Sequence, residues 1–429
     1  MIQSVSPVNC LNGTLHLPPD KSIAQRAALF SLLAEQRSTI SNYPLADDPV
    51  TALRCVEQLG ARVEHKGSVV TVDGVGRQNI CSPHQKIDCG NSGTVMRMLS
   101  GIIAGSGVPA TLTGDPSLSS RPMKRIMDPL VKMGAVVESS AGGYPPLQIH
   151  RTEPFRPITF PLPVPSAQLK SCVLLAGLFG DSPTRVIESV CSRNHTEMML
   201  RLPVKQEQQN HIIESSRAQV IPPQNLEIPG DFSAAAFWLV AASICKGSDM
   251  FLPATGVNPT RCAALHILRR MGANIGITNE RNSGSEPLAD IRVRYAPLKA
   301  VDIGPAEIPN AIDELPVLAV AMAFARGESR ISGAEELRFK ESDRLAAMEQ
   351  MLTKAGVPVL SQKDGLIVTG DPDRRPLAGT FESRHDHRIA MSAAILSLCA
   401  EQVSEIHNAE AAAVSYPGFW EDLVSMSQF

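Results

Sequence analysis

The stretch PDKSIAQRAALFSLLA, Pro19–Ala34, predicts a helix whose start can hold an anion. Asp20 or Ser22 can cap this helix, and Lys21 and Arg26 stand in or near its first turns. Free backbone N–H groups, the positive end of the helix dipole and two cationic side chains together favour a negative ligand. An ordinary capped surface helix with two solvated charges would contain the same residues. Only recurrence of the pattern elsewhere in the chain favours an anion-binding site over this alternative.

Five further alanine-rich runs begin at similar polar or glycine-bearing openings. These openings are Gly90–Thr94, Ser166–Gln168, Gly230–Ser233, Asp313–Pro316 and Asp386–Arg388. Each run leads to a β-branched stretch, a second amphipathic helix and, in most cases, a pair of strands. The chain therefore reads as six β-α-β-α-β-β repeats built around alanine-rich buried helices, which predicts a layered α/β fold.

The sixth repeat reaches the end of the chain before its last strands. We therefore expect the N-terminal strand near Thr14–Leu17 to complete that sheet. This makes one domain discontinuous, formed by residues 1–19 plus 231–429, with residues 20–230 as an inserted domain. Proline-rich segments at Pro18-Pro19 and before Gly230 are suitable hinges.

Composition excludes several classes of function. The 429 residues include 40 basic and 43 acidic side chains, so a net charge of −3 gives no excess for nucleic acid. The longest apolar runs are too short to cross a bilayer, and Met1–Gly13 lacks the pattern of a secretory signal. Nine scattered cysteines without a C-x-x-C pair indicate free thiols and no zinc site. We expect a cytoplasmic protein.

The openings in the first half carry groups that suit anions and polyhydroxy ligands. Gly93 lets a ligand approach the backbone, and Arg121 suits bidentate binding of carboxylate or phosphate. Ser166, Gln168 and Lys170 offer a hydroxyl, an amide and an ammonium group. We expect Ser166 to cap its helix and His195, one strand later, to lie on the surface.

The second half adds candidates for acid–base chemistry. Asp313 stands at a helix start, where a carboxylate is either a cap or a base. Lys340–Arg344 and Arg384–Arg388 combine cations with carboxylates and histidines, which gives general acid–base capacity. Simple charge pairs on helix faces remain the alternative. No Ser-His-Asp order is evident, and no cysteine nucleophile lies in the Arg121 loop.

Taken together, these motifs resemble the 5-enolpyruvylshikimate-3-phosphate synthase family, the 3-phosphoshikimate 1-carboxyvinyltransferases. They match in order and spacing from about residue 10 to about residue 425. The resemblance implies two domains of three repeats each, which close over the substrates. It also implies transfer of the enolpyruvyl group of phosphoenolpyruvate to the 5-hydroxyl of shikimate 3-phosphate, through a tetrahedral ketal that loses phosphate. No metal or organic cofactor is expected, and the protein is expected to be a monomer.

The resemblance assigns roles to individual residues of this chain. Shikimate 3-phosphate would contact Lys21, Ser22, Arg26, Ser166, Ala167, Gln168, Arg193, Asp313 and Lys340. Phosphoenolpyruvate would contact Lys21, Gly93, Arg121, Gln168, Arg344 and Arg388. The catalytic groups would be Asp313, Glu341, Lys21 and His387. Asp313 would take the 5-hydroxyl proton, and Glu341 would transfer the proton at C3.

The chain departs from the family pattern at some positions, and two alternative functions remain open. Val414 stands where some members of the family carry a lysine, so one contact to phosphoenolpyruvate or to the leaving phosphate is missing or supplied elsewhere. Gly93 is retained, which predicts sensitivity to the inhibitor glyphosate. The alternative enzyme is UDP-N-acetylglucosamine enolpyruvyltransferase, which usually has a cysteine in the loop that corresponds to Gly114–Arg121. The alternative from another class is a non-catalytic anion-binding relative.

Overall fold

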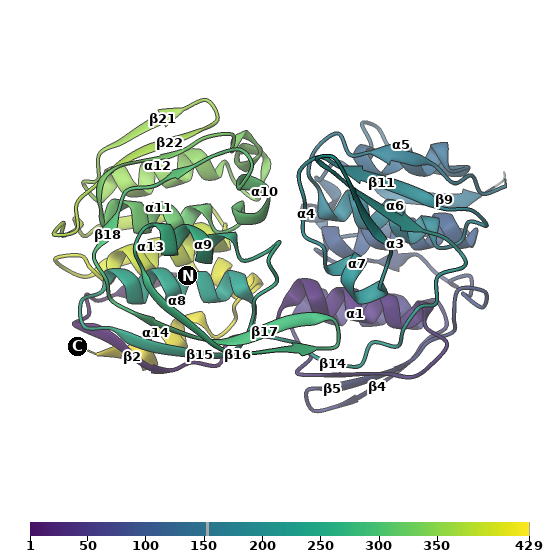
Figure 1. Ribbon diagram of the computed structural model, residues 1–429, viewed down its shortest axis with the longest axis horizontal. Helices are drawn as coiled ribbons and strands as arrows, with labels where there is room; N and C mark the ends of the chain where they lie inside the picture. Colours follow the sequence, from purple (N-terminus) through teal and green to yellow (C-terminus); the bar gives the residue numbers. More distant parts are fainter. Residues whose placement is uncertain (152–153, 429) are drawn as a thin grey trace. The chain divides into compact units, whose positions relative to one another are not determined.

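The computed structural model describes residues 1–151 and 154–428, and these residues form two compact units (Figure 1). Unit 1 contains residues 1–18, 229–281 and 287–429. Unit 2 contains residues 19–228 together with the short segment 282–286. No helix among the described residues is long and apolar enough to span a membrane.

Unit 2 contains three sheets of four strands, each associated with two helices or more. Its helices are α1 Lys21–Leu33, α2 Asp47–Gln58, α3 Gly93–Ser106, α4 Pro116–Ser119, α5 Lys124–Lys132, α6 Ala167–Gly177 and α7 His195–Leu200. Its strands are β3 Ser38–Ser41, β4 Arg62–Lys66, β5 Val69–Asp73, β6 Ile87–Asp88, β7 Ala110–Thr113, β8 Ala135–Ser140, β9 Tyr144–Arg151, β10 Thr159–Pro161, β11 Thr184–Glu188, β12 Val204–Glu207, β13 Asn210–Ser215 and β14 Leu226–Glu227.

Unit 1 contains the other three sheets. Its helices are α8 Phe232–Ile244, α9 Ala263–Arg270, α10 Ile308–Ala311, α11 Leu315–Ala323, α12 Arg344–Lys354, α13 His387–Ser397 and α14 Phe419–Met426, with 3-10 turns at Glu335–Phe339 and Ala409–Val414. Its strands are β1 Ile2–Val5, β2 Cys10–Thr14, β15 Asp249–Gly256, β16 Asn274–Ser283, β17 Glu286–Arg294, β18 Leu298–Lys299, β19 Asp302–Ile303, β20 Ala325–Ile331, β21 Val359–Gln362, β22 Gly365–Gly370, β23 Thr380–Glu382, β24 Ser404–His407 and β25 Ser427–Gln428.

The sheets share one pattern of pairing. In the order β6-β7-β9-β8, the first pair is parallel and the next two are antiparallel. The orders β14-β3-β5-β4, β10-β11-β13-β12 and β18-β20-β22-β21 repeat it. A parallel pair needs a crossover, and a buried helix supplies it between β6 and β7 (α3) and between β10 and β11 (α6), whereas β3 and β14 lie far apart in the sequence. The predicted α/β fold of repeated units is therefore observed.

The N-terminal strands depart from the prediction. A strand near Thr14–Leu17 was expected to complete the sheet of the sixth repeat, and this is wrong. Strand β1 pairs with β24 of that repeat instead. Strand β2 pairs in parallel with β15 of the fourth repeat and also with β25. Strand β14, which precedes α8 of unit 1, joins the sheet of the first repeat in unit 2, and β2, which precedes α1 of unit 2, joins the sheet of the fourth repeat in unit 1.

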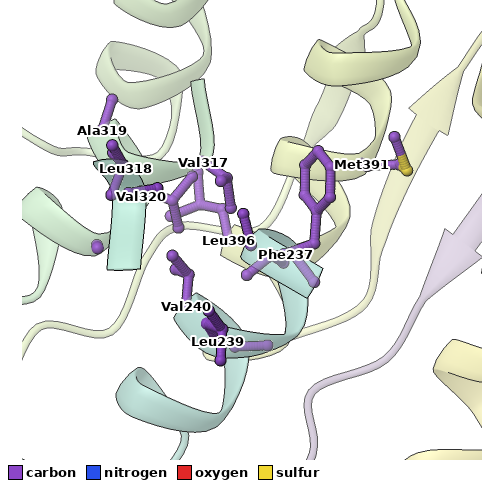
Figure 2. Close-up of a cluster of buried hydrophobic side chains, with 14 of the residues drawn as sticks. Phe237, Leu239, Val240, Val317, Leu318, Ala319, Val320, Met391 and Leu396 are labelled. Carbon is purple, nitrogen blue, oxygen red and sulfur yellow. The ribbon is translucent and has the colours of Figure 1, made fainter. Parts of the chain in front are cut away.

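The six alanine-rich runs are helices, as predicted, and most of their residues are buried. In α8, α11 and α13 every residue is buried. Figure 2 shows the core that these three helices share, with Phe237 and Val240 of α8 beside Val317 of α11 and Leu396 of α13. Small alanine side chains let helices approach closely, so each helix can be surrounded by protein on all sides.

Buried helices still need partners for the free N–H groups of their first turns. Five of the six supply one from a capping side chain, and these caps are Asp20, Ser92, Ser166, Asp231 and Asp386. For the first helix, Asp20 rather than Ser22 is the cap, and Ser166 caps α6 as expected. The remaining N–H groups of each first turn are available to other acceptors.

Candidate active site

The start of α1 places three of the predicted binding residues in unit 2. The carboxylate of Asp20 accepts a hydrogen bond from the Ile23 backbone N–H at 2.9 Å. Lys21 lies in the first turn, where its Nζ is 3.1 Å from Asp48 Oδ2 and its side chain is 31% exposed. The carbonyl of Ser22 accepts a hydrogen bond from Arg26 Nη1 at 3.0 Å. Lys21 is therefore the accessible cation of this helix start, and its charge is shared with Asp48.

Arg26 is buried and joins α1 to α7. Its Nε donates to Thr196 Oγ1 at 3.2 Å, and that hydroxyl lies 2.6 Å from Ser171 Oγ of α6. Burial lowers the pKa of Arg26 to about 10, while Asp20 and Glu197 act to raise it and Arg193 acts to lower it. Arg26 thus stays charged at neutral pH, and a guanidinium group suits an anion such as phosphate.

Gln168 is held in one orientation by two residues of α3. Its Oε1 accepts a hydrogen bond from Arg97 Nη1 at 2.6 Å, and its Nε2 donates to Thr94 Oγ1 at 2.9 Å. Arg97 is itself almost fully buried. Burial is the largest cause that lowers its pKa to about 10, and repulsion from the charges of Arg121 and Arg125 adds to this effect. No role was predicted for Arg97. The available signal was its spacing, because it follows Gly93 by four residues on the same helix face.

The glycine-rich opening before α3 lies beside two guanidinium groups. Arg121 Nη2 donates to Asn91 Oδ1 at 3.0 Å and to Ser117 Oγ at 3.2 Å. A Cβ atom at Gly93 would lie 2.7 Å from Arg97 Nη1 and 3.6 Å from Arg121 Nη1. A side chain at position 93 would thus displace the end of Arg97, which explains why glycine suits this helix start.

Two polar residues of the third repeat are buried rather than accessible. His195 was expected on the surface, and this is wrong: it is fully buried, with Nδ1 2.9 Å from Glu286 Oε1. Glu286 belongs to segment 282–286, which comes from the β16–β17 hairpin, so no local pattern could reveal the contact. Lys170 is also fully buried, with Nζ 2.8 Å from Glu188 and 2.6 Å from Glu197, and it holds the structure together instead of facing a ligand.

In unit 1 the predicted residues Asp313, Glu341 and Arg344 come together. Arg344 is 1% exposed and is surrounded by carboxylates. Its Nε donates to Asp386 Oδ2 at 2.8 Å, its Nη2 to Glu341 Oε2 at 2.7 Å, and its Nη1 to Asp313 Oδ1 at 3.3 Å. Burial acts to lower the pKa of Arg344, but Glu341 and Asp386 outweigh it and the net pKa is raised.

Asp313 is not a helix cap, in contrast to the ordinary interpretation of a carboxylate at a helix start. Glu314 occupies the N-cap position of α11, and Asp313 lies one residue earlier with its side chain 21% exposed. Lys340 Nζ lies 3.8 Å from Asp313 Oδ1. A carboxylate that is partly exposed and lies between two cations can be reached by a substrate hydroxyl and can accept its proton.

Glu341 is the most accessible carboxylate of this cluster, with its side chain 37% exposed. Loss of hydration acts to raise its pKa, but the adjacent guanidinium of Arg344 outweighs this effect, and the net pKa lies below its usual range. Glu341 is therefore ionised at neutral pH while it pairs with Arg344. A ligand that draws Arg344 toward itself would weaken this pairing and make Glu341 a better proton carrier.

The opening of α13 places the last two predicted residues. His387 is the first residue of the helix and is buried, and Arg388 is 8% exposed. Arg388 Nη1 lies 3.8 Å from Glu314 Oε1, and its guanidinium lies 6.0 Å from the centre of the Phe237 ring. Sequence reasoning missed Glu314, although the residue follows Asp313 directly in the motif.

Comparisons with known proteins identify the family of the chain. The family model described as EPSP synthase (3-phosphoshikimate 1-carboxyvinyltransferase) matches residues 5–423. The chain belongs to the EPSP synthase family. This membership covers both units, and the residues from both units that the motifs singled out all lie inside the matched range.

Individual relatives extend the family match over the full length. The chain is 46% identical over 430 residues to a 3-phosphoshikimate 1-carboxyvinyltransferase of Salinibacter ruber, with 100% of both chains covered. It is 46% identical to another from Alkalilimnicola ehrlichii, over 97% of this chain and 94% of the relative. The EPSP synthase structure from Acinetobacter baumannii aligns with a TM-score of 0.89 and 37% identity, covering 99% of this chain and 98% of that one.

Proposed function

We propose that this chain carries out the reaction of its family, transfer of the enolpyruvyl group of phosphoenolpyruvate to the 5-hydroxyl of shikimate 3-phosphate. The substrate oxygen bonds to C2 of phosphoenolpyruvate as C3 gains a proton. The tetrahedral adduct then loses the C3 proton and inorganic phosphate. The observation that carries the proposal is the Arg344 cluster, in which a family-matched cation lies directly against the two carboxylates proposed as proton carriers.

Shikimate 3-phosphate would bind mainly to unit 2. The proposed contacts there are Lys21, Ser22, Arg26, Ser166, Ala167, Gln168 and Arg193, with Asp313 and Lys340 from unit 1. The dianionic phosphate suits Arg26 and Arg193, which already influence one another. The hydroxyls suit the Gln168 amide, whose orientation Arg97 and Thr94 hold in advance. Fixed donors and acceptors lower the entropy cost of placing the reacting hydroxyl.

Phosphoenolpyruvate would bind to cations from both units. Lys21, Gly93, Arg121 and Gln168 would contribute from unit 2, and Arg344 and Arg388 from unit 1. Two anionic substrates repel each other in water, so several fixed cations are needed to hold them at reacting distance. Because the two sets of cations belong to different units, we expect the units to close when the ligands are bound. Solution scattering tests this, since equal compactness with and without both ligands would contradict it.

The proton transfers would use Asp313, Glu341, Lys21 and His387. Asp313 would take the proton of the 5-hydroxyl, because it is partly exposed and lies between Lys340 and Arg344. Glu341 would carry the proton to and from C3. His387, the first residue of α13, would lie near this proton transfer. A positioned carboxylate that gives or takes a proton in the transition state contributes roughly 10²–10⁴ in rate.

A phosphate-release assay tests the activity directly. The purified chain should release one phosphate per turnover only when both phosphoenolpyruvate and shikimate 3-phosphate are present. UDP-N-acetylglucosamine in place of shikimate 3-phosphate should give none, and release with it would favour the alternative transferase. No release with either acceptor would favour a non-catalytic anion-binding relative. We further propose that the enzyme acts as a monomer in the cytoplasm.

Replacing Gly93 with alanine is expected to raise the KM for phosphoenolpyruvate by about tenfold, equivalent to about 1.4 kcal/mol. The added methyl group would come within 2.7 Å of Arg97 Nη1 and push away the donor that orients Gln168. The KM for shikimate 3-phosphate should change less, because Gln168 is one of many proposed contacts of that substrate, whereas Arg121, also beside Gly93, is proposed to bind phosphoenolpyruvate alone. Steady-state kinetics with each substrate varied in turn measure both values, and equal changes in both would contradict the assignment.

The native chain should be inhibited by glyphosate well below millimolar concentration. Gly93 lies beside two guanidinium groups, because a Cβ atom there would be 2.7 Å from Arg97 Nη1 and 3.6 Å from Arg121 Nη1, and these groups are counter-charges for a small anion. Inhibition should be competitive with phosphoenolpyruvate, and Gly93→Ala should weaken it more than it weakens substrate binding. Full activity of the native chain at millimolar glyphosate would contradict this prediction.

A further inference from the structure

A network of buried charges lies at the start of α8 in unit 1. It consists of two carboxylates, Asp231 and Glu314, and two guanidinium groups, Arg261 and Arg388. All four residues are at most 8% exposed. They come from four places in the sequence: the caps of α8 and α11, the loop before α9, and the second residue of α13. Because two positive and two negative groups lie close together and away from water, each strongly restricts the positions of the others.

Arg261 is the residue that connects the two carboxylates. Its Nη2 donates to Asp231 Oδ1 at 2.9 Å and to Ser233 Oγ at 3.2 Å. The Ser233 hydroxyl in turn donates to Glu314 Oε1. The same oxygen of Glu314 lies 3.8 Å from Arg388 Nη1. A continuous path therefore leads from Arg261 through a hydroxyl and a carboxylate to Arg388.

Arg388 is held loosely compared with Arg261. Its contact with Glu314 is 3.8 Å long, and its buried Nε makes no hydrogen bond to any residue that the structure describes. Asp231, Arg388 and Ser415 line a very small cavity of about 10 Å³ beside it. A buried guanidinium with an unused N–H donor retains capacity for an anionic ligand, provided that the neighbouring carboxylates do not capture it.

We propose that Arg261 is a positioning residue that keeps Arg388 available to phosphoenolpyruvate. Arg261 neutralises Asp231 directly and fixes Glu314 through Ser233, so that each carboxylate has a partner of its own. Without Arg261, the carboxylates of Asp231 and Glu314 would both attract Arg388 more strongly. Attraction between opposite charges is strong in a low dielectric, so Arg388 would turn toward them and away from the ligand. The inference rests on the proposed role of Arg388.

Replacing Arg261 with glutamine tests this inference. The KM for phosphoenolpyruvate should rise by about tenfold or more, whereas the KM for shikimate 3-phosphate should stay within about twofold. Arg261→Lys keeps the charge and should give an intermediate value. Arg270→Gln is the matched control, because Arg270 ends the helix α9 that follows the Arg261 loop but is 47% exposed in a surface pair with Glu307, and it should change neither KM.

A charge-balanced double variant separates positioning from simple structural support. Asp231→Asn removes the carboxylate that Arg261 neutralises, and asparagine can still cap α8. Combined with Arg261→Gln, it should bring the KM for phosphoenolpyruvate back to within about threefold of the native value. A purely structural role for Arg261 would make the double variant at least as impaired as the single one. Thermal unfolding of each variant identifies those that do not fold, and for these the Arg261→Lys comparison decides.

Arg388→Gln distinguishes failure of the inference from failure of the site assignment. If Arg388→Gln raises the KM for phosphoenolpyruvate but Arg261→Gln does not, the positioning role of Arg261 is overturned and the proposed site stands. If neither variant changes that KM, the assignment of Arg388 fails and the inference fails with it. If Arg261→Gln weakens both substrates equally, its effect is on the fold alone and the inference is overturned.

Discussion

Asparagine at position 313 is expected to lower kcat by about three orders of magnitude while substrate binding changes little. Asparagine has nearly the shape of aspartate, and its carbonyl can still accept the hydrogen bond that Arg344 donates at 3.3 Å. It cannot accept a proton from the 5-hydroxyl of the substrate. The loss should therefore fall on the chemical step rather than on assembly of the complex.

Three measurements make the Asp313 experiment decisive. Calorimetry should give a dissociation constant for shikimate 3-phosphate within about threefold of the native value. Thermal unfolding should show that the variant folds. Asp373→Asn provides the matched control, because it makes the same chemical change at a side chain that is 79% exposed, and it should leave kcat unchanged. A kcat for Asp313→Asn within tenfold of native would remove Asp313 as the base.

Replacing Lys170 with methionine is expected to cost about 3–5 kcal/mol in the free energy of unfolding. Methionine fills much of the same space but leaves the carboxylates of Glu188 and Glu197 buried without their cation. Both lie at most 5% exposed, so water cannot compensate. Lys205→Met is the matched control: Lys205 also faces a glutamate, at 3.4 Å, but is 59% exposed, and its loss should cost under about 1 kcal/mol.

The stability of the Lys170→Met variant should also depend on pH. Burial already raises the pKa of Glu197 above its usual value, even though Lys170 acts to lower it. Loss of the lysine should raise that pKa further. A carboxyl whose pKa is higher in the folded state than in the unfolded state destabilises the fold as pH rises through that interval. The deficit should therefore be larger at pH 8 than at pH 5, and a deficit independent of pH would contradict this explanation.

Further substitutions should restore the stability that the Lys170→Met variant loses, and that loss should also affect substrate binding. Glutamine at both positions 188 and 197 should recover much of the lost stability of the Lys170→Met variant, because no buried charge then remains. Glu197 belongs to α7, the helix whose Thr196 accepts a hydrogen bond from Arg26. Loosening of α7 should therefore raise the KM for shikimate 3-phosphate more than that for phosphoenolpyruvate.

The helix starts could be predicted from the sequence because their signals are local. A capping side chain, a few cations and an alanine-rich run lie within one short window, and five of the six caps are side chains of those windows. The cluster of Asp313, Glu341 and Arg344 followed from the family motifs and not from any spacing rule, since these residues meet only through the packing of α11 and α12.

Long-range partners could not be predicted. His195 has the polar character of a surface residue, and its burial depends on Glu286, which lies 91 residues further along the chain. Arg261 lies in a loop that carries no recognisable motif. Its hydrogen bonds form only when the chain folds and brings Asp231 and Ser233 against it. The strands β1 and β2 are short, and short strands carry too little pattern to reveal which of several sheets they join.

The division of unit 1 between separate parts of the sequence also determines the order in which the two units can fold during synthesis on the ribosome. Residues 19–228 are continuous and contain all of unit 2 except segment 282–286, so most of that unit can fold while the rest of the chain is still being made. Unit 1 contains segments that precede and follow unit 2 in the sequence, so it can be completed only after residues 19–228 have been synthesised. Strand β2 pairs with β25, and its Cys10 lies opposite Gln428. One edge of β2 therefore stays unpaired until Ser427 and Gln428 of β25 have been synthesised.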